Sequence, residues 1–315
     1  MTMISDHWSQ LIDPRVREAF FIGFSQMDRP QSMLPNLFNM QGSDLADEKV
    51  LAIGGISSQG WNFEDSGRVQ YTEPVKGYEE TFTHHEFARG ITVERKLIDD
   101  NRIQRALDAA TNLGDSAFRV REKAGANVFI NAFSAATSET LDDYGTDATG
   151  SDAVALCSTA HPRSPQETGT TDSNEGTLAL SKANVSTTRQ LMAEFVDMNG
   201  DLLGIMPNEL LVPIELEDTA VEIVRSALDP SSANNAVNPQ AGRFQLKVWH
   251  YLTDANAWFL IDSAARQQSL VWYDRIGLEF DREQDFDTLI AKWRAYMRFS
   301  LGWKDYRWVY GNNPS

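Results

Sequence analysis

The sequence has little of what disulfide bonding, nucleic-acid binding or membrane insertion requires. It has one cysteine among 315 residues, so no internal disulfide can form and nothing demands an oxidising compartment. Lys and Arg number 28 against 45 Asp and Glu, and the net charge of −17 argues against general nucleic-acid binding and against docking on an anionic membrane. The densest apolar run, 257–261, is too short to span a bilayer, and the first residues lack a secretory signal. We therefore expect a folded, soluble protein.

Motifs for catalysis and cofactor binding are also missing. There is no phosphate-binding Gly-x-x-x-x-Gly-Lys loop, no Gly-x-Gly-x-x-Gly opening a helix, and no Gly-x-Ser-x-Gly elbow. Cys157 and His161 lie four residues apart beside Pro162, where nothing fixes the contact that a thiolate–imidazole nucleophile needs.

The run His84-His85-Glu86 is the nearest approach to a metal cluster, but on a strand His85 points away from the other two side chains. We interpret the run as polar residues of an exposed hairpin. The carboxylate pairs Asp99/Asp100 and Asp142/Asp143 are better explained as a helix cap and a solvated loop. The sequence therefore predicts no catalytic residue, no cofactor and no metal.

Residues 1–45 do not look like part of a domain core. They hold three prolines and scattered apolar side chains, and no period is sustained beyond about residues 14–24. Phe20, Phe21 and Phe24 lie close together in the sequence, and a solvated tail seldom contains three aromatic residues so close together. We predict an arm that becomes ordered by lying on another surface.

Residues 49–93 are predicted to form β structure. The runs 50–53, 68–72 and 78–87 favour strands, and glycines separate them. Because polar residues occupy both faces of the last run, its strand has no core of its own. The pattern predicts a long hairpin projecting from the body, with its tip within 57–77; the alternative is an edge hairpin of a compact sheet.

From residue 99 the apolar period becomes helical. Ile103, Leu107, Ala110, Ala117, Ala124 and Val128 fall on one stripe. The pattern runs to about residue 135, and roughly 34 residues would form a rod about 50 Å long. Gly114 and Gly125 each weaken the helix by about 1 kcal/mol relative to alanine, and either could kink it.

The rest of the chain suggests a long loop, a second lobe and an aromatic sheet. Residues 137–180 are rich in Ser, Thr, Asp and Gly and are predicted to be a surface excursion. Helices are predicted over 186–199 and 216–228. Strands are predicted over 208–214, 244–252, 257–262, 270–273 and 276–280, and the segment 291–310 is expected to complete the sheet that packs on the spine helix.

Several runs, taken in order, resemble one family. They are Glu86-Phe-Ala-Arg-Gly-Ile-Thr-Val-Glu-Arg-Lys-Leu-Ile-Asp-Asp-Asn101, Ala155-Leu-Cys-Ser-Thr-Ala-His-Pro162, Ala257-Trp-Phe-Leu-Ile-Asp262 and Leu270-Val-Trp-Tyr-Asp-Arg-Ile-Gly-Leu-Glu-Phe280. The set resembles the major capsid proteins of tailed phages with the HK97 fold, closest to the major head subunit of Mu-like phages, and the resemblance covers most of the chain after about residue 45.

The resemblance implies an α+β, HK97-like capsid fold. It divides the chain into an N-terminal arm (1–46), an extended hairpin loop (47–93), a peripheral domain with the spine helix and the long loop (94–182), an axial domain (183–266) and the C-terminal part of the peripheral sheet (267–315).

The resemblance also implies a structural protein and not an enzyme. Such a protein self-assembles, as pentamers and hexamers, into the icosahedral shell of the virion, after synthesis in the host cytoplasm. The implied partners are a separate scaffolding protein, a portal and a decoration protein, with packaged DNA contacted only non-specifically and no membrane. Lys49 and Lys76 lie in or beside the hairpin, but no motif designates either for an isopeptide crosslink, and none is predicted.

Large apolar anchors are expected to carry the subunit contacts. The candidates are Phe20, Phe21, Phe24, Leu37 and Phe38 in the arm and Trp61, Phe63 and Tyr71 in the hairpin, and the alternative for each is packing within the subunit. Three other functions remain as alternatives: an encapsulin-like compartment shell, an enzyme using Cys157 and His161, and a monomeric binding domain.

Overall fold

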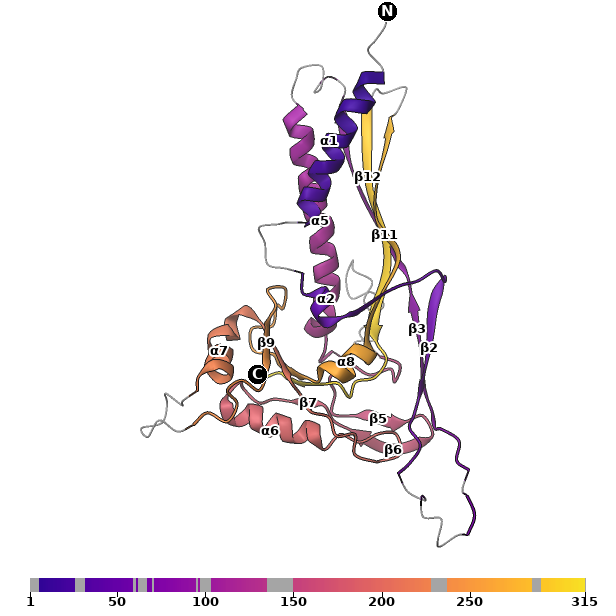
Figure 1. The fold of residues 1–315 in the computed structure, drawn as a ribbon, viewed down its shortest axis with the longest axis vertical. Coiled ribbons are helices and arrows are strands. Elements are labelled where there is room, and N and C mark those ends of the chain that lie inside the picture. Colours follow the sequence, from indigo (N-terminus) through magenta and orange to yellow (C-terminus); the bar gives the residue numbers. More distant parts are fainter. Residues whose placement is uncertain are drawn as a thin grey trace, which may run out of the picture.

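The computed structural model shows an elongated molecule with two packed regions and a projecting hairpin (Figure 1). In the upper region of the figure two long helices run beside long strands, and in the lower region shorter helices and strands form a second body. The structure describes residues 6–25, 32–58, 61, 67–69, 71–94, 96, 103–134, 150–227, 237–284 and 290–314.

A four-stranded sheet organises the upper region. Its order is β1 (Asn39–Gly42), β11 (Leu270–Gln284), β12 (Ile290–Trp303) and β4 (His85–Glu94), with β1 parallel to β11 and the other pairs antiparallel. Along β12, Trp293, Met297 and Phe299 are buried whereas Lys292 and Arg294 are exposed. This alternation indicates a sheet with one covered face. The strands predicted over 270–273 and 276–280 are one continuous strand.

Two helices cover that face, α1 (Asp6–Ser25) and α5 (Ile103–Ile130), which lie side by side in Figure 1. Phe20 of α1 stacks on Phe280 of β11 with ring centroids 4.2 Å apart, and Val16 and Trp293 belong to the same buried cluster. The arm is therefore helical well before residue 14 and packs on its own subunit. This corrects the prediction that a period is confined to residues 14–24.

The predicted spine helix is confirmed over 103–130. It is continuous over 28 residues, which at 1.5 Å per residue is about 42 Å, and neither Gly114 nor Gly125 breaks it. Residues 99–102 and 135 of the expected helix lie outside the described residues.

Glycine is required where α1 crosses α5. A side-chain carbon on Gly114 of α5 would overlap the carbonyl oxygen of Phe20, and one on Gly23 of α1 would overlap the carbonyl oxygen of Thr111. The two helix backbones thus touch at reciprocal glycines, where any larger residue would push them apart. The glycines that weaken the helix in isolation are the ones that allow it to pack.

The lower region is built on a five-stranded sheet. Its order is β7 (Glu175–Gly176), β13 (Val309–Asn312), β10 (Trp258–Ile261), β8 (Glu209–Val212) and β9 (Gln245–Val248). The helices α6 (Lys182–Ala193) and α7 (Glu217–Arg225) supply Val185, Met192 and Ile223 to a core around Trp258, and the short helix η2 (Ile214–Leu216) packs Leu216 against it. The strand expected at 307–310 was assigned to the sheet beside the spine, but β13 pairs with β10 and lies inside this second sheet.

The segment 150–180 is packed and not a free surface excursion. It contains the two-stranded sheet of β5 (His161–Ser164) and β6 (Glu167–Asp172), and Ala155, Leu156 and Cys157 are buried. The residues 137–149 of the same predicted loop lie outside the described residues. The short apolar run 153–157, which interrupts the polar composition of the predicted loop, anchors the segment to the core.

The projecting hairpin consists of β2 (Asp47–Ile53) and β3 (Lys76–Thr83), which are antiparallel. At His84 the chain leaves it, and β4 continues as an edge strand of the four-stranded sheet, paired with β12. The hairpin therefore ends at residue 83 and not 93, because residues 85–94 find pairing partners in the body. Its connecting segment, within 54–75, agrees with the predicted tip, but the strand predicted over 68–72 is wrong at residues 68, 69, 71 and 72.

Candidate assembly site: the hairpin and its socket

Large apolar side chains stand in solvent on the segment that joins β2 to β3. Trp61 is 81% exposed and Tyr71 is 95% exposed, and Ile56 and Val69 are each more than half exposed. A soluble domain seldom leaves two rings this open on one loop, and clustered exposed apolar side chains mark interaction surfaces. Phe63, the third hairpin candidate, lies outside the described residues.

The arm candidates divide differently. Phe20 and Leu37 are fully buried and Phe38 is 4% exposed, packed edge-to-face against Trp272. These three fill the core of their own chain, so the expectation that they form subunit contacts is corrected. Phe21 is 39% exposed, and Phe24 is half-buried near Phe118.

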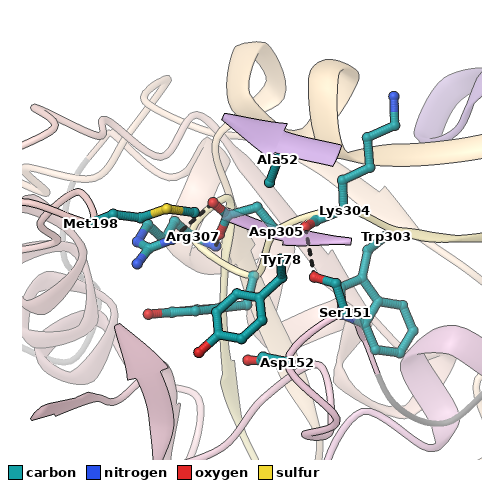
Figure 2. A pocket seen from close by; sticks show the side chains of 10 residues that line it. Ala52, Tyr78, Ser151, Asp152, Met198, Trp303, Lys304, Asp305 and Arg307 are labelled. Atoms are coloured by element: carbon teal, nitrogen blue, oxygen red, sulfur yellow. Dashed lines mark hydrogen bonds and ion pairs between the residues drawn. The ribbon is translucent and has the colours of Figure 1, made fainter. Parts of the chain in front are cut away.

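A narrow pocket lies where the hairpin meets the body, and we call it the hairpin socket (Figure 2). Ala52 of β2 and Tyr78 of β3 line it from the hairpin, and Met198 and Arg307, at the left of the view, line it from the body. The remaining lining residues are Ser151, Asp152, Trp303, Lys304, Asp305 and Tyr306. Burial, with the negative charge of Asp152, raises the pKa of the Tyr78 hydroxyl, so this ring is neutral in the socket.

The floor of the socket is a network around Arg307. Its guanidinium donates to the carbonyls of Val196 and Arg163 at 2.8 and 3.0 Å and pairs with Asp305 at 2.9 Å. Asp172 accepts from Arg163 at 2.6 Å and from the Tyr306 hydroxyl at 3.2 Å. These charge-assisted bonds hold three segments together below the socket: the β5–β6 hairpin, the chain after α6 and the chain before β13.

A tight turn over residues 197–201, which we call the lobe turn, lies beside the socket. The Asp197 carboxylate accepts from the amides of Asn199 and Asp201, and Gly200 is left-handed with φ +86°. Asp201 in turn accepts from the Ser58 amide at 2.6 Å and the Ser58 hydroxyl at 2.7 Å, and Asn199 donates to the Gly55 carbonyl at 2.8 Å. The lobe turn thereby holds the segment that follows β2, residues 54–58, which we call one leg of the hairpin; the residues that lead into β3 form the other leg. The helix predicted over 186–199 is wrong after residue 193, because α6 ends at Ala193. The composition of Asp197-Met-Asn-Gly-Asp201 is typical of a turn and is the local signal for this end.

Cys157 and His161 are not arranged for nucleophilic catalysis. His161 is fully buried, with Nδ1 2.6 Å from Asp152 and Nε2 3.0 Å from Asn174, so both ring nitrogens are engaged away from the thiol. Burial, with the charge of Glu175, raises the pKa of the Cys157 thiol well above its usual range, which keeps it protonated. His161 stacks on the ring of Tyr306 at 3.7 Å, and Cys157 belongs to the buried apolar cluster that contains Trp308 and Val309.

The run His84–Glu86 also differs from its prediction. His84 is buried at the junction of β3 and β4, where its Nε2 lies 3.3 Å from the Ser43 hydroxyl and its Nδ1 lies 2.9 Å from the Ser300 hydroxyl. Only His85 and Glu86 are exposed as expected. Among the residues that the structure describes, no three His, Cys, Asp or Glu side chains are grouped to hold a metal.

A second buried polar site joins the two regions at α2 (Leu34–Leu37). Glu122 of α5 accepts hydrogen bonds from Ser32, the Met33 amide and Trp249 at the N-terminal end of α2. At the other end, Lys247 donates to the Asn36 carbonyl and Arg266 to the Leu37 carbonyl, and both cations pair with buried Glu209. Cations at a helix C-terminus and an acceptor at its N-terminus match the unsatisfied groups of each end.

The sequence matches the family model described as phage capsid protein over residues 78–312, most of the chain. The chain belongs to the phage capsid protein family. The expectation of a major capsid protein is confirmed, and membership of this structural family favours it over the enzyme and compartment-shell alternatives. No curated protein sequence matches this capsid protein.

Solved structures share the fold of this capsid protein at low sequence identity. The capsid of an empty GTA particle is 13% identical with a TM-score of 0.58 over 91% of each chain. The mature capsid of bacteriophage PhiM1 is 11% identical with a TM-score of 0.58 over 91% of this chain and 88% of that one. A virus-like particle from Pyrococcus furiosus is 10% identical with a TM-score of 0.52 over 95% and 98%. The HK97-like α+β fold is confirmed.

No helix in the described part of the capsid protein is long and apolar enough to cross a membrane.

Proposed function

We propose that this capsid protein is the major head subunit of a tailed phage, closest to those of Mu-like phages, and that it self-assembles through pentamers and hexamers into an icosahedral shell. The observation that carries the proposal is the hairpin: β2 and β3 project from the body and end in a segment with Trp61 and Tyr71 in solvent. Burying these rings on a neighbouring subunit would remove a large apolar area from water, which is the usual source of interface affinity.

The proposed division of labour follows the two sheets. The four-stranded sheet with α1 and α5 would be the peripheral domain, and the five-stranded sheet with α6 and α7 would be the axial domain around the capsomer axis. The hairpin would reach over the adjacent subunit, and exposed Phe21 and half-buried Phe24 of α1 would add a second contact.

The proposal includes partners and a location. A separate scaffolding protein, a portal and a decoration protein would act with the shell, assembly would take place in the host cytoplasm, and the shell would end in the virion. The net charge of −17 supports only non-specific contact with packaged DNA, because a surface of that sign repels phosphate.

The test compares assembly of the full chain with that of two variants, by light scattering and negative-stain microscopy, with and without the candidate scaffold. Trp61→Ala with Tyr71→Ala is expected to leave the subunit's melting temperature unchanged and to reduce shell formation more than tenfold. Val237→Ala, which shortens another exposed apolar side chain, is the matched control and should assemble normally. A wild-type chain that stays near 35.3 kDa in both conditions would refute the assembly proposal.

A further inference from the structure

Apart from Met198 of the lobe turn, little apolar contact holds the described part of the lower half of the hairpin. At its upper end Phe82 packs on Val271 and Tyr273 of β11, with Val50 beside them. Below this cluster the exposed side chains begin, and Leu51 and Ile56 are largely open to solvent. A two-stranded ribbon without a covered face does not fix its own direction, so something else must.

The lobe turn supplies that attachment with a set of matched polar bonds. Asp201 accepts from both donors of Ser58, one on each carboxylate oxygen, and Asn199 donates to the carbonyl of Gly55, three residues before Ser58. The other strand leg is held as well, because Gln166 of the β5–β6 turn donates to the Lys76 carbonyl at 2.7 Å. The bonds to Ser58 also lower the pKa of Asp201, so this carboxylate stays ionised as an acceptor.

Close packing accompanies the bonds. Met198 of the lobe turn passes against both hairpin legs at glycines: a side-chain carbon on Gly54 would lie 3.1 Å from its sulfur, and one on Gly77 would lie 2.8 Å from its terminal methyl carbon. The Gly54 amide donates to the Val75 carbonyl at 2.7 Å, so the legs are tied to each other at the level where Met198 meets them. Both legs therefore move together if the lobe turn releases one.

We infer that Asp201 and Asn199 are positioning residues, which set the direction of the hairpin from within the subunit before any neighbour is met. This inference rests on the proposed role of the hairpin in subunit contact. The direction of Trp61 and Tyr71 is then a property of the free subunit, and the lobe turn couples it to the five-stranded sheet region. Because the bonds lie at the surface, they are weak enough to exchange for contacts with another copy of the chain.

The test is hydrogen exchange on the full-length, unassembled subunit, followed in peptides from residues 47–58 and 71–83. Asp201→Ala is expected to accelerate exchange in these peptides about five- to tenfold, because the Ser58 bonds are lost, while peptides from β11 and β12 keep the wild-type rate. Ser58→Ala, which removes only the hydroxyl bond, is expected to give a smaller acceleration of about two- to threefold.

The matched control is Glu215→Ala, which removes an exposed carboxylate from η2 in the same region and should leave the hairpin peptides unchanged. Hairpin exchange equal to wild type in both Asp201→Ala and Ser58→Ala would overturn the inference. Because the readout is made on the free subunit, it stands apart from the assembly test: a chain that forms no shell would refute the proposed function and still report whether the lobe turn holds the hairpin.

Discussion

Replacing Gly114 by alanine tests whether α1 and α5 pack backbone to backbone. In an exposed helix interior this change stabilises by about 1 kcal/mol, since alanine has the better helix propensity. Here the added carbon would overlap the Phe20 carbonyl oxygen, a backbone atom that cannot rotate away. The helices must separate, and at their contact Phe20 and Val16 are both fully buried.

The magnitude follows from what separation costs. A radial gap of about 0.5–1 Å forfeits a quarter to a half of a dispersion contact, and complete truncation of a buried phenylalanine costs about 3–5 kcal/mol. Because the added carbon overlaps a backbone atom, the gap lies at the upper end of this range, and losing about half of the Phe20 packing, less the propensity gain of about 1 kcal/mol, gives a net destabilisation of about 0.5–1.5 kcal/mol. For a chain of this size that lowers the melting temperature by about 1–3 °C.

Urea unfolding followed by tryptophan fluorescence measures the change, because Trp293 lies in the same buried cluster. Gly277→Ala is the control, since a side-chain carbon there meets open space. Gly125→Ala should cost less than Gly114→Ala, because its new carbon meets the side chains of Leu34 and Phe38, which can shift. A Gly114→Ala protein as stable as wild type would show that the helices do not touch at this glycine.

Three further predictions concern buried polar groups. Burial and the nearby Arg298 charge lower the pKa of His84, so near the ordinary histidine pKa of about 6.5 the unfolded chain binds a proton that the folded chain does not, and the free energy of unfolding falls as the pH is lowered. Urea titrations near pH 7.5 and pH 5.5 should show a smaller fall for His84→Gln than for wild type. An equal fall in the two proteins would contradict this. Lys247→Met should lower the unfolding free energy by about 3 kcal/mol, because Glu209 and the Asn36 carbonyl lose a buried partner. A loss below about 1 kcal/mol would show that the contacts of Lys247 at the C-terminal end of α2 do not stabilise the fold. Cys157 should resist a thiol reagent until the chain is unfolded, and modification of the native protein at the rate of a free thiol would disprove its burial.

The elements that could be predicted from the sequence are those with strong local signals. The apolar stripe of α5 and the short apolar runs of β8 and β10 match their predicted positions within a few residues. Each of these signals arises from burial of one face, which periodicity reports directly. The projecting hairpin was also predictable, since its last run carries polar residues on both faces.

What depended on pairing between distant segments was not predictable. No local feature shows that residues 85–94 leave the hairpin for β12, or that 309–312 belong to the sheet of β10. Phe20, Leu37 and Phe38 are as apolar as an exposed anchor would be, and only the position of α5 and β11 decides that they are covered. The lobe turn has a local signal in its own composition, but no local feature indicates its contact with Ser58, about 140 positions earlier.

The position of β13 has a consequence for the timing of biogenesis. Residues 309–312 lie between β7 and β10, so the five-stranded sheet stays open while residues 175–261 are already outside the ribosome. The strand β13 reaches that gap only when residue 312 has left the exit tunnel, and until then Trp258 and Leu260 lack part of their cover. A nascent chain that has not yet exposed residues 309–312 therefore has no finished lower region to offer a neighbour.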